Sequence, residues 1–212
     1  MIALERETIQ AMQRGQHRVQ ELASWTVREE IAGDYAHLNE SQRAAVDQIL
    51  ASRDQILALD GIAGAGKTTA LAAVRQAAER DGYHVAGFAP TSGAAQQLEE
   101  AGIASTTLQR HLARVEESHV RDKRLYVLDE SSLASTKQLH AFLHRLGADD
   151  RVLLVGDVPQ HQSVDAGRPY QQLQEAGMET ARLEAIVRQR DPALRAVVEQ
   201  LARRRPRRGP PA

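Results

Sequence analysis

Short, continuously apolar runs alternate with amphipathic stretches through the central part of the chain. The runs predict strands and the amphipathic stretches predict helices. The predicted strands are Ile56–Leu59, Tyr83–Ala89, Leu125–Leu128 and Val152–Val155. The predicted helices cover residues 40–51, with Asn39 as N-cap, and residues 68–80, 93–100 and 136–146. Since a strand that is apolar throughout must be covered on both sides, this pattern predicts an α/β fold whose parallel sheet carries helices on both faces.

The two ends of the chain differ from this central part. Residues 1–36 are polar with sparse apolar positions, which suit one or two amphipathic helices broken near Gly15, and Gly33-Asp34 marks a boundary. The apolar positions of this helical N-terminal segment are Leu4, Ile9, Met12, Val19, Leu22 and Val27. An α/β unit over 37–202 follows, and then a tail over 203–212 that contains five Arg and three Pro. We expect the tail to be disordered, as a solvated remnant rather than a DNA-binding arm.

Composition narrows the class of protein. Hydrophobic residues make up 42% of the 212 residues and aromatic residues only 3%, so the core must be built from Ala, Leu, Val and Ile. The formal net charge of -1 means that any DNA binding must come from local sites. The absence of Cys excludes disulfides and thiolate metal sites. With no apolar run that could span a membrane, a cytoplasmic protein is the simplest expectation.

The most specific motif is Gly61-Ile-Ala-Gly-Ala-Gly-Lys67-Thr68, which fits G-x-x-x-x-G-K-[ST] in full. It follows a predicted strand and opens a predicted helix, as a phosphate-binding loop (P-loop) does. Glycines let successive backbone N–H groups point at phosphates, and the helix N-terminus adds partial positive charge. Lys67 can reach the β- and γ-phosphates and Thr68 can ligate Mg²⁺, so the motif predicts ATP with Mg²⁺. This context disfavours the alternative of a glycine-rich turn with a surface lysine.

Two further strand ends carry polar residues. Asp129 and Glu130 follow the third strand, where an Asp can hold Mg²⁺ and a Glu can polarise the attacking water. Gln160 follows the fourth strand, where it could sense the γ-phosphate or that water. Carboxyl ends of parallel strands lie at one edge of a sheet, where ligands bind. Taken alone, an acid pair at a strand end is weak evidence, since acids often cap helices.

The order and spacing of these motifs resemble superfamily 1 helicases, in particular the RecD-like lobe of conjugative relaxase–helicases of the TraI/TrwC type in the MobF family. The resemblance implies a RecA-like P-loop NTPase lobe that works on single-stranded DNA and moves 5′ to 3′. The nucleotide-binding positions that it implies are Gln42, which would read the adenine edge, and Gly61, Gly64, Ala65, Gly66, Lys67, Thr68 and Thr69. The catalytic positions are Lys67, Glu130, Gln160 and Arg188, the metal positions are Thr68 and Asp129, and the DNA-binding positions are Thr91, Ser92 and Thr107.

Several of these residues have simpler interpretations. Thr91 and Ser92 could cap the following helix, and Gln42 could be an exposed helix residue. For His111, a histidine on a helix face is favoured over a functional role. His140 and His144 stand four residues apart, as two ligands on one helix face would. Because no third ligand is apparent, a solvated or packed pair is favoured.

We therefore expect the ATP-binding motor lobe of a DNA helicase. The second helicase lobe and the relaxase nuclease domain are not identifiable, so a fragment or degenerate copy of a conjugative relaxase is expected. Such a chain should bind ATP–Mg²⁺, hydrolyse it slowly and not unwind duplex DNA alone. The alternatives are a non-helicase P-loop ATPase or kinase, and a non-catalytic interaction module.

Overall fold

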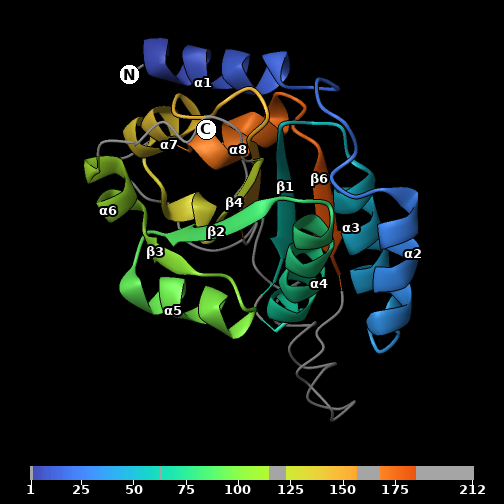
Figure 1. Ribbon diagram of the computed structural model, residues 1–212. Helices are drawn as coiled ribbons and strands as arrows, with labels where there is room; N and C mark the ends of the chain where they lie inside the picture. Colours follow the sequence, from blue (N-terminus) through green and yellow to red (C-terminus); the bar gives the residue numbers. More distant parts are fainter. Residues whose placement is uncertain (1, 63, 115–122, 157–167, 185–212) are drawn as a thin grey trace, which may run out of the picture.

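A computed structural model describes residues 2–62, 64–114, 123–156 and 168–184. All the strands in this part of the chain form one parallel sheet, in the order β3-β2-β4-β5-β1-β6 (Figure 1). The strands are β1 (Ile56–Gly61), β2 (His84–Ala89), β3 (Ser105–Thr107), β4 (Arg124–Leu128), β5 (Arg151–Gly156) and β6 (Thr180–Leu183). The predicted α/β fold, a RecA-like parallel sheet behind a helical N-terminal segment, is confirmed.

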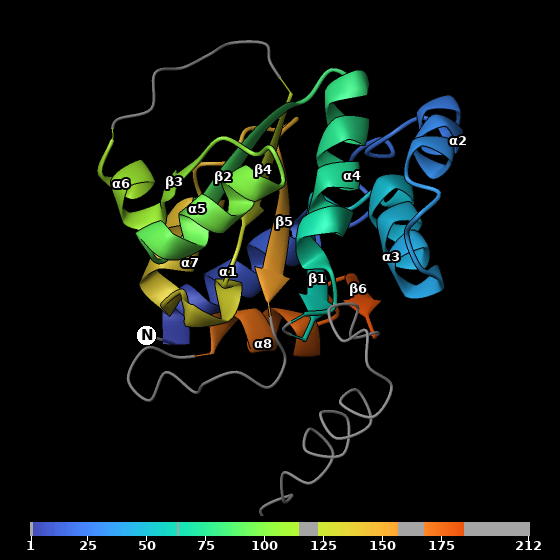
Figure 2. The ribbon, with the colours of Figure 1, turned by 90° about the horizontal axis from the view of Figure 1, so that it is seen from below.

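Helices cover both faces of this sheet (Figures 1 and 2). One layer contains α2 (Trp25–Asp34), α3 (Glu40–Ala51), α4 (Lys67–Arg80) and α5 (Ser92–Glu100). The other contains α1 (Ile2–Arg14), α6 (Leu108–Ala113), α7 (Thr136–Leu143), preceded by the 3-10 turn η1 (Ser131–Leu133), and α8 (Pro169–Glu175). None of the described helices is long and apolar enough to cross a membrane.

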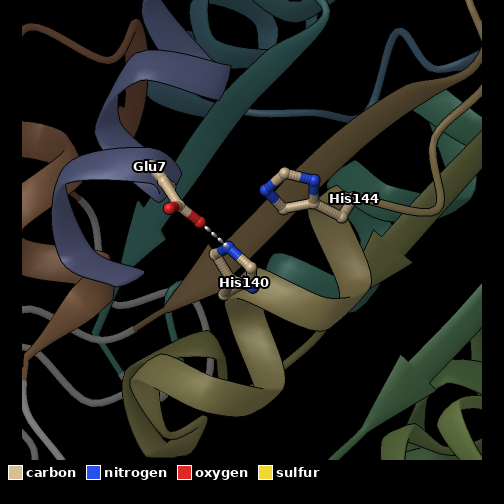
Figure 3. A group of neighbouring side chains, drawn as sticks. All are labelled: Glu7, His140 and His144. Atoms are coloured by element: carbon tan, nitrogen blue, oxygen red, sulfur yellow. Dashed lines mark hydrogen bonds and ion pairs between the residues drawn. The ribbon is translucent and has the colours of Figure 1, made fainter. Parts of the chain in front are cut away.

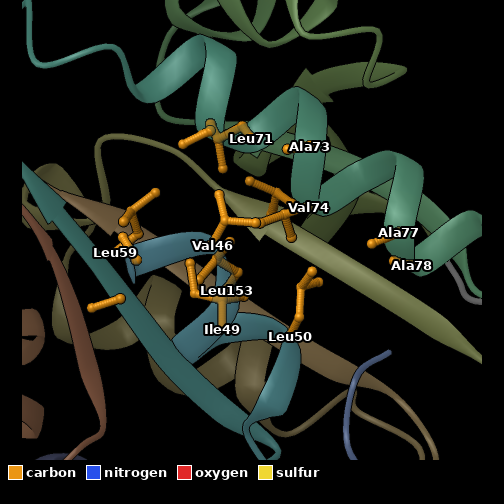
Figure 4. Close-up of a cluster of buried hydrophobic side chains, with 14 of the residues drawn as sticks. Val46, Ile49, Leu50, Leu59, Leu71, Ala73, Val74, Ala77, Ala78 and Leu153 are labelled. Carbon is orange, nitrogen blue, oxygen red and sulfur yellow. The ribbon is translucent and has the colours of Figure 1, made fainter. Parts of the chain in front are cut away.

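The core consists of two apolar layers separated by the sheet. Alternate residues of a strand point to opposite faces, so Leu57 and Leu59 join one layer while Ile56 and Ala58 join the other. Figure 4 shows Val46 of α3 and Val74 of α4 meeting over the sheet in the first layer. Burial of each such large aliphatic side chain contributes roughly 1.5–3 kcal/mol. This double burial is the reason why the central strands read as unbroken apolar runs.

The predicted elements are all present, with small differences at their ends. The first helix ends at Arg14, beside Gly15, and the helix predicted over 136–146 ends at Leu143. Asn39 is the N-cap of α3, as predicted. The short strands β3 and β6 and the helices α6 and α8 had no prediction. The two strands lie at the edges of the sheet, where a long apolar run is not required.

The segment between α1 and α2 runs along the edge of the sheet where the strands begin, and Arg151 anchors it. The Arg151 side chain is fully buried and donates hydrogen bonds to the carbonyl oxygens of Gln20 (2.9 Å), Ser52 (2.9 Å) and Asp54 (2.7 Å). Burial lowers the pKa of the guanidinium. Because a buried charge needs such partners, Arg151 holds the N-terminal segment against the start of β5.

Candidate nucleotide-binding site

The turn from Gly61 to Gly66 joins β1 to α4 at the edge where the strands end. Gly64 and Gly66 adopt left-handed backbone angles, with φ of 82° and 85°, which residues with a Cβ rarely adopt. A Cβ on Gly61 would lie 3.1 Å from Cβ of Leu183 on β6. Gly64 and Gly66 therefore have backbone angles that favour glycine, Gly61 packs closely against β6, and these residues fit a bound phosphate group.

Lys67 is the first residue of α4 and folds back over the turn. Its Nζ donates a hydrogen bond of 2.6 Å to the carbonyl oxygen of Gly61. Within the turn Ala65 is buried, whereas Thr68 and Thr69 are partly exposed in the first turn of the helix. The structure thus brings the lysine, both threonines and the glycines together at one helix N-terminus, as the motif predicts.

Gln42 connects this turn to α3. Its side chain is buried, with Oε1 accepting from the backbone N–H of Asn39 (3.0 Å) and Nε2 donating to the carbonyl oxygen of Gly66 (3.2 Å). Asn39 Oδ1 in turn accepts from the backbone N–H of Gln42 (2.9 Å), which completes a capping box. The interpretation of Gln42 as an exposed helix residue is therefore wrong. Its contact with adenine stays a prediction.

The acid pair lies where β4 ends, at the same edge of the sheet. Asp129 Oδ1 accepts from the backbone N–H of Glu130 (2.8 Å), and the Asp129 N–H donates to the carbonyl oxygen of Phe88 (2.8 Å). Glu130 has left-handed backbone angles (φ 49°, ψ 37°), which cost a non-glycine residue on the order of 1 kcal/mol. Both acidic side chains are partly exposed. Strain at this position is typical of a functional site.

A buried polar network that the sequence did not predict lies at the end of β1. Asp60 is buried, and its carboxylate accepts from the Tyr170 hydroxyl and from Gln174 Nε2 (2.8 Å). A Cβ on Gly156 would lie 2.8 Å from the Tyr170 ring, so the ring packs directly on the β5 backbone. The network fixes the residue that precedes Gly61, and it joins residues more than a hundred positions apart. No local sequence signal could have indicated it.

The three residues predicted to contact DNA start two neighbouring helices. Thr91 Oγ1 accepts from the backbone N–H of Ala94 (3.2 Å) at α5, and Thr107 Oγ1 accepts from that of Arg110 (3.3 Å) at α6. Because Ala89 and Thr107 are paired across β2 and β3, both helices begin side by side. Thr91 and Ser92 are exposed. Capping by Thr91 is confirmed, whereas DNA contact stays a prediction.

His111 belongs to an aromatic cluster on the α6 side of the sheet. Its ring centroid lies 4.3 Å from that of Phe88 and 5.7 Å from that of Phe142. Burial lowers the pKa of His111, and the nearby cations Arg145 and Arg114 lower it further. The structure therefore favours a neutral packed histidine, in agreement with the sequence interpretation.

Gln160, Arg188 and the tail over 203–212 lie outside the described residues.

Comparison with known proteins identifies the family. Residues 37–209 match the family described as "AAA domain". The chain belongs to this AAA domain family. The family implies nucleotide binding, usually with Mg²⁺. The matched range includes the Asn39–Gln42 capping box.

Curated relatives of this AAA domain come from conjugation and from DNA helicases. It is 38% identical to "Conjugal transfer protein TraA" of Rhizobium radiobacter, over 80% of this chain and 16% of that protein. It is 32% identical to "Multifunctional conjugation protein TraI" of Escherichia coli K12, over 79% of this chain and 10% of that protein. It is 34% identical to "ATP-dependent RecD2 DNA helicase" of Deinococcus radiodurans, over 72% of this chain and 22% of that protein. The predicted resemblance to RecD-like lobes of conjugative relaxase–helicases is confirmed.

The chain therefore spans less than a quarter of the length of these relatives. Among solved structures, the arterivirus nonstructural protein 10 helicase with DNA is similar, with 15% identity and a TM-score of 0.47 over 77% of this chain and 42% of that one.

Proposed function

We propose that this chain is the ATP-binding motor lobe of a DNA helicase, which binds ATP with Mg²⁺ and holds single-stranded DNA along the same edge of its sheet. The observation that carries the proposal is the complete P-loop. Its two left-handed glycines and its lysine lie at the end of β1, at the edge that also carries Asp129 and Glu130.

The P-loop supplies the groups that hold phosphates. The backbone N–H groups of residues 64–67 and the N-terminus of α4 attract negative charge. Lys67 now donates to the carbonyl oxygen of Gly61, and a phosphate oxygen would compete for the same ammonium protons. Thr68, one residue on in the first turn of α4, offers its hydroxyl to Mg²⁺. Bound Mg²⁺ neutralises phosphate charge and orients the phosphates.

Asp129 follows β4, which lies two strands away from β1, the strand that leads into this loop. Leu128 pairs with Leu154 of β5, and Leu154 pairs with Ala58 of β1, so β5 alone separates the two strands. Two strand spacings correspond to roughly 10 Å. We infer that Asp129 would help to hold the metal and that Glu130 would accept a proton from the attacking water. Gln160 and Arg188 are proposed to complete the site at the γ-phosphate.

DNA contact is proposed at the starts of α5 and α6. The exposed hydroxyls of Thr91 and Ser92, with Thr107 beside them, suit phosphate oxygens rather than base edges. Such contacts hold DNA of any sequence, as a translocating motor requires. They also agree with the formal net charge of -1, because binding then depends on local groups rather than on a charged surface.

The relatives support this proposal and also limit it. The names of TraA, TraI and RecD2 refer to conjugal transfer, conjugation and ATP-dependent DNA helicase activity. The second helicase lobe and the relaxase domain are the proposed partners of this lobe. Because an arginine supplied by a partner can accelerate hydrolysis greatly in related NTPases, we expect this lobe alone to hydrolyse ATP slowly and not to unwind duplex DNA.

Calorimetric titration of the purified chain with Mg-ATP tests the proposal. We expect binding with a stoichiometry near one, and no binding by Lys67→Ala. Lys123→Ala is the matched control, since Lys123 is exposed beside the start of β4, at the opposite edge of the sheet. Binding that persists in Lys67→Ala would refute the P-loop assignment.

Stimulation of ATP hydrolysis by single-stranded DNA separates a helicase lobe from other P-loop proteins. We expect a slow basal rate that rises when single-stranded DNA is added. Nucleotide binding without such stimulation would favour a non-helicase ATPase or kinase. Robust ATP-driven unwinding by the pure monomer would contradict the expected dependence on a second lobe.

A further inference from the structure

Three potential metal ligands from two distant segments converge on the face of the sheet opposite the P-loop helix α4. Glu7 of α1, His140 of α7 and His144, the C-cap residue of α7, each offer one ligand atom, and these atoms all lie within 4.8 Å of one another (Figure 3). His140 Nε2 is 2.8 Å from Glu7 Oε2. The two histidine ring centroids are 4.1 Å apart.

The local structure explains why these side chains meet. His140 and His144 are four residues apart on α7, so they lie on one face of the helix. His144 is the C-cap residue yet keeps right-handed helical backbone angles (φ -73°, ψ -11°). Helix α1 packs across α7, which brings Glu7 over that face although it lies 133 residues from His140 in the sequence. The third ligand that the sequence did not reveal is thus supplied by the fold.

We propose that Glu7, His140 and His144 bind a transition-metal ion of the Zn²⁺ type. Two imidazole nitrogens and one carboxylate oxygen suit Zn²⁺, whereas Mg²⁺ and Ca²⁺ prefer oxygen ligands alone. A water molecule would fill the fourth position of a tetrahedron. The site is distinct from the proposed Mg²⁺ position at Thr68 and Asp129 and does not depend on nucleotide binding.

The present geometry requires only small side-chain movements. Ligand bonds of about 2.1 Å in a tetrahedron separate two ligand atoms by about 3.4 Å. The 2.8 Å contact between Glu7 and His140 must therefore open slightly. The remaining separations are all within 4.8 Å, so none of them has to close by more than about 1.4 Å. Glu7 and His144 are exposed, so rotation of their side chains can supply this shift.

A bound ion would tie the N-terminal helix to the lobe. The contact between Glu7 and His140 contributes little by itself, because half of the Glu7 side chain is accessible to water. A metal ion that binds only the folded state adds stability through mass action. The 3-10 turn η1 connects the Asp129-Glu130 segment to α7. A bound ion would therefore fix α1 against α7, the helix that follows the acid pair in the chain.

Zinc titration of the full untagged chain, stripped with a chelator and free of nucleotide, tests the site. We expect one Zn²⁺ to bind and the melting temperature to rise by several degrees, with no such rise for Mg²⁺. His144→Ala should weaken binding at least tenfold, while the exposed His37→Ala serves as the matched control and should bind normally. Equal zinc affinity of His144→Ala and the unchanged chain would overturn the proposal.

Two further measurements keep the test decisive if a histidine variant folds poorly. Glu7→Gln keeps a hydrogen-bonding oxygen beside His140 but removes the charge, so we expect weaker zinc binding without loss of folding in the stripped protein. Co²⁺ in place of Zn²⁺ should give the visible absorption of tetrahedral nitrogen and oxygen coordination, and Glu7→Gln should change it. Zinc binding that is lost only when His119 or His161 is replaced would place the ion elsewhere and refute the site.

Discussion

Gln42 Nε2 donates a hydrogen bond of 3.2 Å to the carbonyl oxygen of Gly66, the last residue before the α4 helix of the P-loop. This bond makes the position of the glycine turn depend on the start of α3. Gln42 Oε1 is engaged with the backbone N–H of Asn39, so the two ends of one amide serve two different elements. A residue that the resemblance assigns to adenine therefore also has a role within the protein.

Gln42→Glu should separate the role of the side chain as acceptor for Asn39 from its role as donor to Gly66. The carboxylate keeps the acceptor for Asn39 but loses the donor for Gly66, and it places a negative charge beside the phosphate cradle. We expect the Kd for Mg-ATP, measured by calorimetry, to rise by about tenfold or more. The melting temperature should fall as well, because Gln42 is buried and the new charge faces a carbonyl oxygen. Gln138→Glu is the matched control, because Gln138 occupies the equivalent position in the capping box of α7. Equal affinity losses in both variants would show that the contact with Gly66 is unimportant.

Glu130→Gln should uncouple binding from hydrolysis. An amide cannot accept the proton of the attacking water, so we expect the hydrolysis rate to fall by roughly 10²–10⁴-fold. Mg-ATP affinity should remain, because the hydrogen bond to Asp129 Oδ1 comes from the backbone N–H of Glu130, which the substitution keeps. The rate is measured by phosphate release with single-stranded DNA present. An unchanged rate would assign proton acceptance to another residue.

The sequence predicted the parts of the fold whose cause is local. Runs such as Val152–Val155 are apolar because both of their faces are buried. The glycines at 61, 64 and 66 predict a phosphate-binding turn. The strand β3 (Ser105–Thr107) was missed because a polar edge strand carries no such pattern. The contacts of Asp60 with Tyr170 and of Glu7 with His140 were missed because each depends on how distant elements pack.

Thr91→Asp should distinguish a helix cap from a DNA contact. Aspartate is at least as good an N-cap as threonine and interacts favourably with the helix dipole, so α5 should keep or gain stability. If the exposed Thr91 faces DNA phosphates, the added charge should repel them. We expect single-stranded DNA affinity, measured by fluorescence anisotropy, to fall several-fold at low salt. Ser135→Asp at the N-cap of α7 is the control, and equal DNA affinity of Thr91→Asp and the unchanged chain would leave Thr91 as a cap alone.

His111 should make the stability of the fold depend on pH near neutrality. Burial lowers its pKa in the folded state, with Arg145 and Arg114 adding to the shift, so the unfolded chain binds a proton more readily than the folded one. Stability is therefore retained above the unfolded pKa of about 6.5 and is lost as the pH falls from there through the lower folded pKa.

His111→Phe should weaken this dependence, because the phenyl ring can occupy the same aromatic cluster without titrating. Urea unfolding of the two proteins between about pH 7.5 and pH 5.5 measures the effect. We expect the free energy of unfolding to fall less steeply toward acid pH in His111→Phe, while replacement of the exposed His37 by Phe leaves the slope unchanged. Parallel slopes for all three proteins would mean that His111 is protonated to the same extent in the folded and in the unfolded chain. Its contact with Phe88 would then not disfavour the charged ring.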